Sequence, residues 1–135
     1  MKPGGWLVDE DFDSVSLLPD PTVSPSEVIL KTQMGVMQLL KDRGAERRFG
    51  RLLYGRLRAH GLAEVGAEGR LFMSRSGSAS VSLMRANFEQ LRGALLDARY
   101  TTEQEFAQDI AHLDDPDFMA PSPIMWTAWG RRPSA

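Results

Sequence analysis

Three short runs of β-favouring residues, spread widely along the chain, constrain its fold most. They lie at residues 6–8, 62–72 and 124–130, and two helix-like stretches separate each run from the next. The order strand, helix, helix, strand, helix, helix, strand is typical of an α/β protein. The sequence therefore predicts three strands and about four helices, and three strands are few for a free-standing doubly wound sheet.

The first two helices are expected between the first and second strands. Residues 24–27 (SPSE) combine an N-cap serine, a proline at the first helical position and a capping-box glutamate. The helix that they open should stop near Gly44. The next helix should run over residues 46–60 and end at Gly61. Its inner face should comprise Phe49, Leu52, Leu53 and Leu57, which recur at helical spacing.

The other two helices follow a strand at residues 62–72 and a polar loop at 74–78. The third helix, at residues 80–98, has the clearest periodicity, with apolar residues at steps of three and four. Residues 102–105 (TEQE) form a capping box that opens the fourth helix, and an Asp- and Pro-rich segment ends it. The core is predicted to include Met34, Met37, Met84, Phe88 and Phe106.

Composition excludes several classes of protein. The absence of cysteine rules out disulfides, thiolate zinc sites and cysteine nucleophiles. No apolar run approaches the roughly 20 residues that span a bilayer, and the N-terminal residues lack a hydrophobic signal core. The net charge of -2 is unlike that of an electrostatic nucleic-acid binder. We expect a cytoplasmic protein that binds neither nucleic acid nor membrane.

Four acidic residues follow the first apolar run. Asp9, Glu10, Asp11 and Asp13 stand at the carboxyl end of that strand, where open α/β sheets bind ligands. Their carboxylates could orient a substrate amine, act as a base or bind a divalent cation. The alternative is a solvated acidic loop beyond the strand. We take the four as candidate substrate-binding residues and expect no metal site.

Other polar residues give weaker signals. His60 and His112 stand near helix ends, where the helix dipole favours them without any catalytic role. No spacing of serine, histidine and aspartate specifies hydrolysis, so no catalytic residue is identified. Arginines concentrate between residues 47 and 58 and form either a phosphate-binding helix face or a solvated one.

Three segments in order resemble class I S-adenosylmethionine-dependent methyltransferases. Residues 1–8 (MKPGGWLV) are similar to the turn that precedes strand five of that family. Residues 57–65 (LRAHGLAEV) resemble the entry into strand six. Residues 114–131 contain DDPDF, SPIM and AWGR, which are similar to the closing segment of a bacterial subfamily of small-molecule methyltransferases.

This resemblance implies the C-terminal half of a Rossmann-like methyltransferase domain. Residues 6–12 would be strand five and 62–73 strand six. Residues 123–130 would be strand seven, which runs antiparallel between the other two. Residues 1–135 would be a single partial domain, and the helical segment 79–113 an insertion that helps to cover the substrate.

The same resemblance implies what is missing. The family holds S-adenosylmethionine on its first strands, with a Gly-x-Gly-x-Gly loop that this sequence lacks. The chain is therefore expected to be the substrate-side portion of a methyltransferase that does not bind the donor by itself. Its expected partners are a complementing donor-binding half and a small-molecule substrate. The alternative is a non-enzymatic module that forms a homo-oligomer, or docks on a partner, through the strand edge that strand four would occupy.

Overall fold

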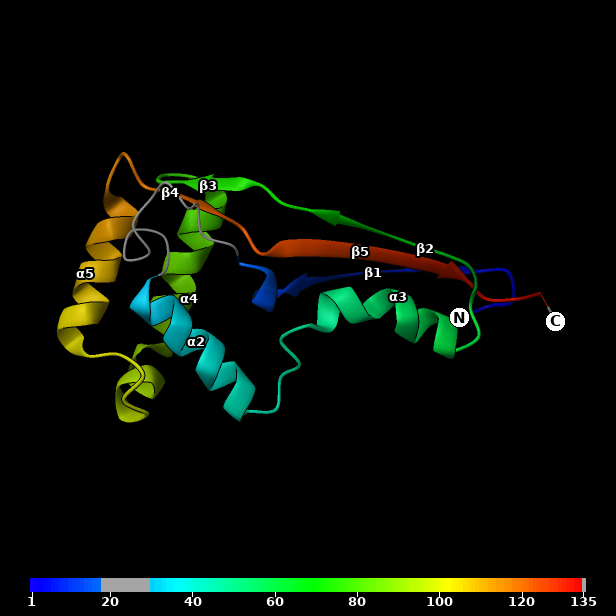
Figure 1. The fold of residues 1–135 in the computed structure, drawn as a ribbon, viewed down its shortest axis with the longest axis horizontal. Helices are drawn as coiled ribbons and strands as arrows, with labels where there is room; N and C mark the ends of the chain where they lie inside the picture. Colours follow the sequence, from blue (N-terminus) through cyan, green and yellow to red (C-terminus); the bar gives the residue numbers. More distant parts are fainter. Residues whose placement is uncertain (18–29, 135) are drawn as a thin grey trace. The chain divides into compact units, whose positions relative to one another are not determined.

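The chain gathers into two compact units, each built from segments that are distant in sequence. A computed structural model describes residues 1–17 and 30–134 (Figure 1). The sheet unit comprises Met1–Leu17, Glu46–Leu71 and Ser122–Ala135, and the helical unit comprises Leu18–Ala45 and Phe72–Pro121. The expected insertion at residues 79–113 falls within the helical unit. The expectation of one partial domain stays a prediction.

Three strands form the sheet unit. They are β1 (Trp6–Asp13), β2 (Ala63–Arg70) and β5 (Ile124–Arg131), in the spatial order β1-β5-β2. Strand β5 pairs antiparallel with both neighbours, so β1 and β2 run parallel to each other. The sequence predictions that the last strand lies between the other two, and that it runs against them, are confirmed.

A single α-helix of the described sheet unit, α3 (Phe49–Ala59), covers one face of this sheet (Figure 1). Leu53 and Leu57 pack on the fully buried Ala128 of β5, as the helical spacing of the sequence predicted. The helix ends as expected, because Gly61 takes a positive φ of 76° that favours glycine.

The pairing register shows which side chains lie on each face of the sheet, because directly paired residues point the same way. One set faces α3: Leu7, Asp9, Asp11 and Asp13 of β1, Ala67 and Gly69 of β2, and Ile124, Trp126, Ala128 and Gly130 of β5. The other set points away from α3: Trp6, Val8, Glu10 and Phe12 of β1, Gly66, Glu68 and Arg70 of β2, and Met125, Thr127, Trp129 and Arg131 of β5. We call this second face the open face.

A hydrogen-bonded carboxylate stands just ahead of α3. The side chain of Arg48 and its backbone N–H both donate to Glu46, and they lower the pKa of Glu46 from its ordinary value of 4.5 to about 2. A carboxylate with a lower pKa in the folded state stabilises the fold above its unfolded pKa, and that contribution is lost as the pH falls.

We therefore expect Glu46 to account for part of the loss of stability between pH 4.5 and about 2. The Glu46→Gln variant cannot titrate at this position, so its stability should fall less steeply over that range. Urea denaturation of both proteins at a series of pH values measures the difference. Parallel stability curves would contradict the prediction.

The described part of the helical unit contains three helices and a short two-stranded sheet. The helices are α2 (Lys31–Asp42), α4 (Ala79–Asp97) and α5 (Glu103–Asp114). The strands β3 (Met73–Arg75) and β4 (Met119–Pro121) pair antiparallel. Apolar residues of α2, α4, α5 and β4, together with Leu30 and Phe118, share one core. Its buried members are Leu30, Val36, Leu39, Val81, Phe88, Leu95, Phe106, Leu113, Phe118 and Ala120.

Local signals predicted two of these helices well. Helix α4 buries Val81, Phe88 and Leu95 at the predicted spacing. Helix α5 begins with the predicted capping box, in which Thr102 accepts from the Glu105 N–H and the Glu105 carboxylate accepts from the Thr102 N–H. Helix α2 begins at Lys31. The cap predicted at residues 24–27 lies outside the described residues.

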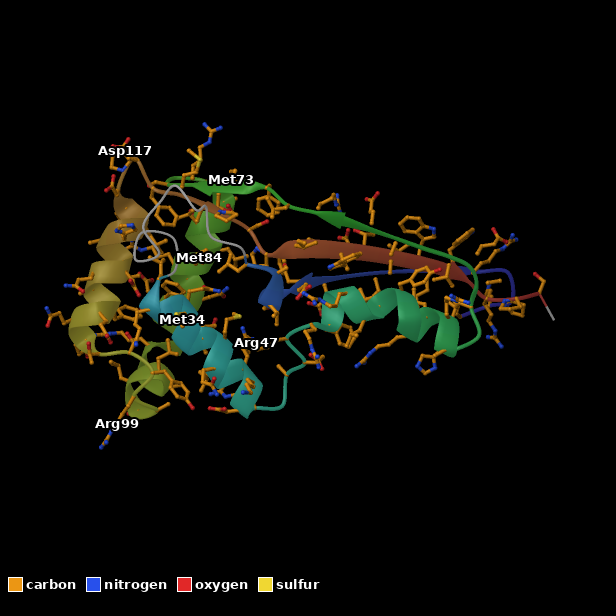
Figure 2. The ribbon with its side chains drawn as sticks, viewed as in Figure 1. Met34, Arg47, Met73, Met84, Arg99 and Asp117 are labelled. Atoms are coloured by element: carbon orange, nitrogen blue, oxygen red, sulfur yellow. The ribbon has the colours of Figure 1, made fainter. Side chains whose placement is uncertain are left out.

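Two sequence predictions are wrong in detail. The strand expected over residues 62–72 stops at Arg70, and β3 then pairs with β4 instead of β5. Residues 119–131 also do not form one continuous strand, because Pro123 lies between β4 and β5 and has no N–H to donate to a strand ladder. Met34 was expected in the core, but it is 56% exposed, whereas Met84 packs against the core (Figure 2).

Candidate functional site

The four acidic residues predicted to bind substrate lie within β1, because the strand continues to Asp13. Their side chains alternate between the two faces of the sheet. Asp9, Asp11 and Asp13 point to the side of α3, and Glu10 points to the open face. The shared face of the three aspartates agrees with the sequence prediction for a continuing strand. The four carboxylates therefore do not converge on one point.

Asp13 has a structural role. The residue is only 1% exposed, and its carboxylate pairs with the Arg51 side chain of α3. The same carboxylate accepts from the Val15 N–H at 3.1 Å and so caps the short 3-10 helix η1 (Ser14–Ser16). Ser16 donates its hydroxyl hydrogen to the Asp13 carbonyl and accepts from the Ile124 N–H at 2.8 Å. Asp13 thus ties the end of β1 to α3 and, through Ser16, to β5.

Asp9 and Asp11 are less constrained. Asp9 lies opposite the buried Ala128 and is half-buried, whereas Asp11 is exposed. The Asp11 carboxylate accepts from the backbone N–H of Phe12 at 2.6 Å. No salt bridge joins either aspartate to a basic residue among the described parts of the chain. Both carboxylates therefore keep the capacity to accept hydrogen bonds from a ligand.

Glu10 is the centre of a polar network across the open face. Arg70 of β2 donates to the Glu10 carboxylate at 2.6 Å, and the Thr127 hydroxyl of β5 donates to the same oxygen at 2.5 Å. Arg70 also donates to the Thr127 hydroxyl oxygen at 2.9 Å. Each of the three strands therefore contributes one residue. Glu10 and Arg70 remain exposed, so water screens their attraction.

Sequence reasoning missed Arg70 and Thr127. They lie 60 and 117 residues from Glu10 along the chain, and the strand pairing brings them together. Arg70 stood at the end of a predicted strand, and Thr127 stood within another. Side chains alternate between the two faces of a strand, which restricts each residue to one of two faces. Deciding that Arg70 and Thr127 share a face with Glu10 also requires the register between the strands.

Apolar and aromatic side chains surround this network. Trp6 is 52% exposed and Val8 is 62% exposed, whereas Phe12, Met125 and Trp129 are half-buried. The ring of Trp129 lies flat enough against β2 that a Cβ atom at Gly66 would approach it to 2.5 Å. The glycine is therefore required for the ring to cross the neighbouring strand.

Arg131 closes one end of the open face. Its guanidinium lies 6.0 Å from the centre of the Trp6 ring, which is within range of a cation–π contact. It also donates to the Gly4 carbonyl at 3.0 Å and to the Glu64 carboxylate at 3.3 Å. These bonds link the turn that precedes β1 to β5 and β2.

The histidines and most arginines of α3 have structural roles in the fold. His60 is the exposed C-cap residue of α3, and the ring of His112 makes an edge-to-face contact with Phe118 at 5.7 Å. The arginines of α3 do not form one free basic face, since Arg51 pairs with Asp13 and Arg56 lies over the Phe49 ring. Among the described residues, no group of acidic and histidine side chains could hold a metal ion.

A shallow groove between α4 and α5 is a second, weaker candidate. It has a volume of about 450 Å³, and Phe106, Ala107 and Ile110 contribute its apolar lining. Arg92 pairs with Glu103 at 2.5 Å, and its guanidinium lies 5.5 Å from the Phe106 ring centre. Arg92 and Glu103 therefore already satisfy each other, and the third charged lining residue, Glu89, accepts from Arg85 at 3.0 Å.

No known family model matches this sequence, and no curated protein is significantly similar to it. The helices that the structure describes include none that is long and apolar enough to cross a membrane. A function has to be inferred from the strand order and from the side chains that the sheet presents.

Proposed function

We propose that this chain is the C-terminal, substrate-side portion of a S-adenosylmethionine-dependent methyltransferase domain with a Rossmann-like sheet. One observation carries this proposal: the spatial order β1-β5-β2, with β5 antiparallel to both neighbours. The methyltransferase resemblance implied this order for strands five, seven and six. A central antiparallel strand that comes last in sequence is a specific arrangement, and three unrelated strands would have several others open to them.

The donor would be held by a complementing half. S-adenosylmethionine needs a glycine loop between a strand and a helix N-terminus. The glycines nearest to β1, Gly4 and Gly5, precede the strand and form a turn in which the Gly5 N–H donates to the Lys2 carbonyl. In the proposed assembly, the strand of the donor-binding half pairs with the free edge of β1, which has no neighbour in the described sheet.

The substrate would meet the acidic residues of β1. Asp13 is engaged by Arg51, so its proposed role is to position the strand rather than to contact substrate. Asp9, Glu10 and Asp11 retain accessible carboxylate oxygens, and Asp9 and Asp11 have no cationic partner among the described residues. In methyl transfer the protein acts mainly by aligning the nucleophile with the donor methyl group. Asp9 and Asp11 share one face of the sheet and would orient a basic or hydroxylated acceptor, whereas Glu10 lies on the opposite face.

Calorimetry with S-adenosylmethionine tests the proposal on two proteins. The first is this chain, which should show no micromolar binding. The second is the product of the reading frame extended upstream of the codon for Met1, or of a neighbouring frame co-expressed with this chain, which should carry a Gly-x-Gly-x-Gly loop and bind the donor. Micromolar binding by this chain alone would contradict the proposed division of the site. If no such frame exists, or its product fails to bind the donor, the methyltransferase proposal is wrong.

A second candidate function is a binding module that pairs with another chain through the β1 edge. The exposure of Trp6, Leu7 and Val8 favours it, because exposed apolar edge strands invite pairing. The acidic second half of β1 makes a copy of itself a poor partner there, since like charges would meet across an antiparallel pair. Deuterium exchange tests this function: a partner strand on this edge should slow exchange of β1 amides in protein isolated with its native partner, and unchanged exchange would exclude it.

A further inference from the structure

The two outer strands of the sheet differ in how their free edges are protected. Strand β2 has a break in register between Ala63 and Gly66, and Glu64 takes a positive φ of 52° within that break. Such a bulge twists an edge away from pairing with another strand. Strand β1 pairs with β5 over its whole length without a break, so its other side presents a regular edge. Of the two edges, that of β1 is the one suited to accept a further strand.

Hydrogen bonds at the two ends of β1 show which of its backbone groups point to the free edge. The Gly5 carbonyl accepts from the Arg132 N–H, on the side of β5, whereas the Ser14 N–H donates to the Arg47 carbonyl, outside the sheet. Backbone groups alternate between the two sides of a strand. The groups that point away from β5 therefore belong to the even-numbered residues. These are Trp6, Val8, Glu10 and Phe12.

The charges along β1 select the kind of strand that can pair there. Asp9 and Asp11 lie on the α3 side and make no salt bridge within the described parts of the chain. Glu10, on the open face, is already paired with Arg70. Opposite charges that face each other across a strand pair stabilise it, and like charges destabilise it. The edge therefore disfavours an acidic strand and favours one with basic residues at two alternate positions.

The first half of β1 adds an apolar requirement. Trp6 and Val8 are largely exposed, and both lie on the open face. Apolar side chains that lie opposite each other across a strand pair cover one another. The matching half of a partner strand should therefore place apolar residues on that same face.

We propose that the free edge of β1 binds an extended basic segment of another protein as an antiparallel strand. Its basic residues lie opposite Asp9 and Asp11, and its apolar residues lie opposite Val8 and Trp6. The partner segment thus has the order basic, any residue, basic, apolar, any residue, apolar. The antiparallel direction is the more stable one per residue. This pairing rests on the second candidate function, in which β1 pairs with another chain, and it specifies the chemistry of that chain.

A blocked hexapeptide, lysine-threonine-lysine-valine-threonine-valine, tests the pairing on the whole chain. Its lysines face Asp11 and Asp9 when it runs antiparallel to β1. Isothermal titration at low ionic strength should show binding in the micromolar range. A peptide with glutamate in place of both lysines should bind at least tenfold more weakly. Asp9→Asn combined with Asp11→Asn should weaken binding of the lysine peptide about tenfold, because two exposed ion pairs are lost.

Asp97→Asn combined with Asp117→Asn is the matched control. Both aspartates are exposed, and neither makes a salt bridge within the described chain. This variant removes the same amount of charge and should bind the lysine peptide as the wild-type protein does. Equal weakening by the two double variants would show that the peptide responds only to net charge, and would overturn the proposal.

Val8→Pro tests the backbone pairing, because it removes an N–H that points to the free edge and none that pairs with β5. It should abolish peptide binding while circular dichroism shows a folded protein. If the variant does not fold, N-methylation of the peptide at the valine opposite Val8 makes the same test. N-methylation at the following threonine is its control, since that N–H points away from β1.

Three outcomes would overturn the proposal while leaving the second candidate function intact. The first is a native partner that protects the β1 amides from deuterium exchange although the lysine peptide does not bind. The second is a glutamate peptide that binds as tightly as the lysine peptide. The third is tighter binding of the lysine peptide in reverse order, which would show a parallel strand.

Discussion

Replacing Gly50 with alanine should destabilise the sheet unit by about 3 kcal/mol, the upper range for an overpacked site. Gly50 lies in the first turn of α3, where the helix meets β1. A Cβ atom there would come within 2.4 Å of the Asp11 carbonyl oxygen and 2.9 Å of the Phe12 carbonyl carbon. Both are backbone atoms of a paired strand, so no side-chain rotation can relieve the contact. The helix itself would have to move away from the sheet.

Gly55→Ala is the matched control, because Gly55 belongs to the same helix and a Cβ atom there would meet nothing within 4 Å. At that position alanine should stabilise the protein by about 0.5–1 kcal/mol, since glycine loses more backbone entropy in a helix. Urea denaturation followed by circular dichroism measures both variants. Stabilisation by both substitutions would show that helix propensity, rather than close packing on β1, controls this helix.

Replacing Asp13 with alanine should cost about 2 kcal/mol of unfolding free energy. The change removes a charged hydrogen bond with Arg51 and the cap on the Val15 N–H, and bonds to charged groups contribute about 1.5–3 kcal/mol each when buried. The expected loss is smaller than the sum of two such bonds because Arg51 is 44% exposed, so water replaces part of the lost interaction. Thermal or urea unfolding of the variant measures the loss.

Asp9→Ala is the comparison for Asp13→Ala, since both aspartates point to the same side of β1. Asp9 has no salt bridge within the described chain, so its removal should change stability by no more than about 0.5 kcal/mol. Equal losses for the two variants would show that the acidic residues of β1 act as one electrostatic group. Unequal losses would separate the residue that holds the fold from the residues free to contact a ligand.

Helices with local signals were predictable from the sequence. The spacing of Val81, Phe88 and Leu95 identifies the buried side of α4, because every such residue repeats the same helical face. The capping box of α5 and the terminating Gly61 of α3 are likewise encoded within four residues. The central position of β5 followed only from the family resemblance, since periodicity does not specify the neighbour of a strand.

Features that depend on long-range pairing were not predictable in the same way. The network of Glu10, Arg70 and Thr127 requires the register of three strands, and a shift by one residue would send these side chains to opposite faces. Met34 shows that the buried face of a helix can be equally hard to predict from the sequence. The apolar residues of α2 fall on more than one side, and the helix buries Val36 and Leu39 instead of Met34.

The position of β5 in the sheet has a consequence for how the protein is made. β1 and β2 have no common neighbour until residues 124–131 are available, although β1 is synthesised first. During translation the two outer strands must wait for the strand that joins them, and their apolar residues stay open to misassociation meanwhile. The helical unit ends before β5 begins, so it can form while the sheet is still incomplete. The sheet unit therefore folds only after β5 has been synthesised, and its folding is governed by contacts of high sequence separation.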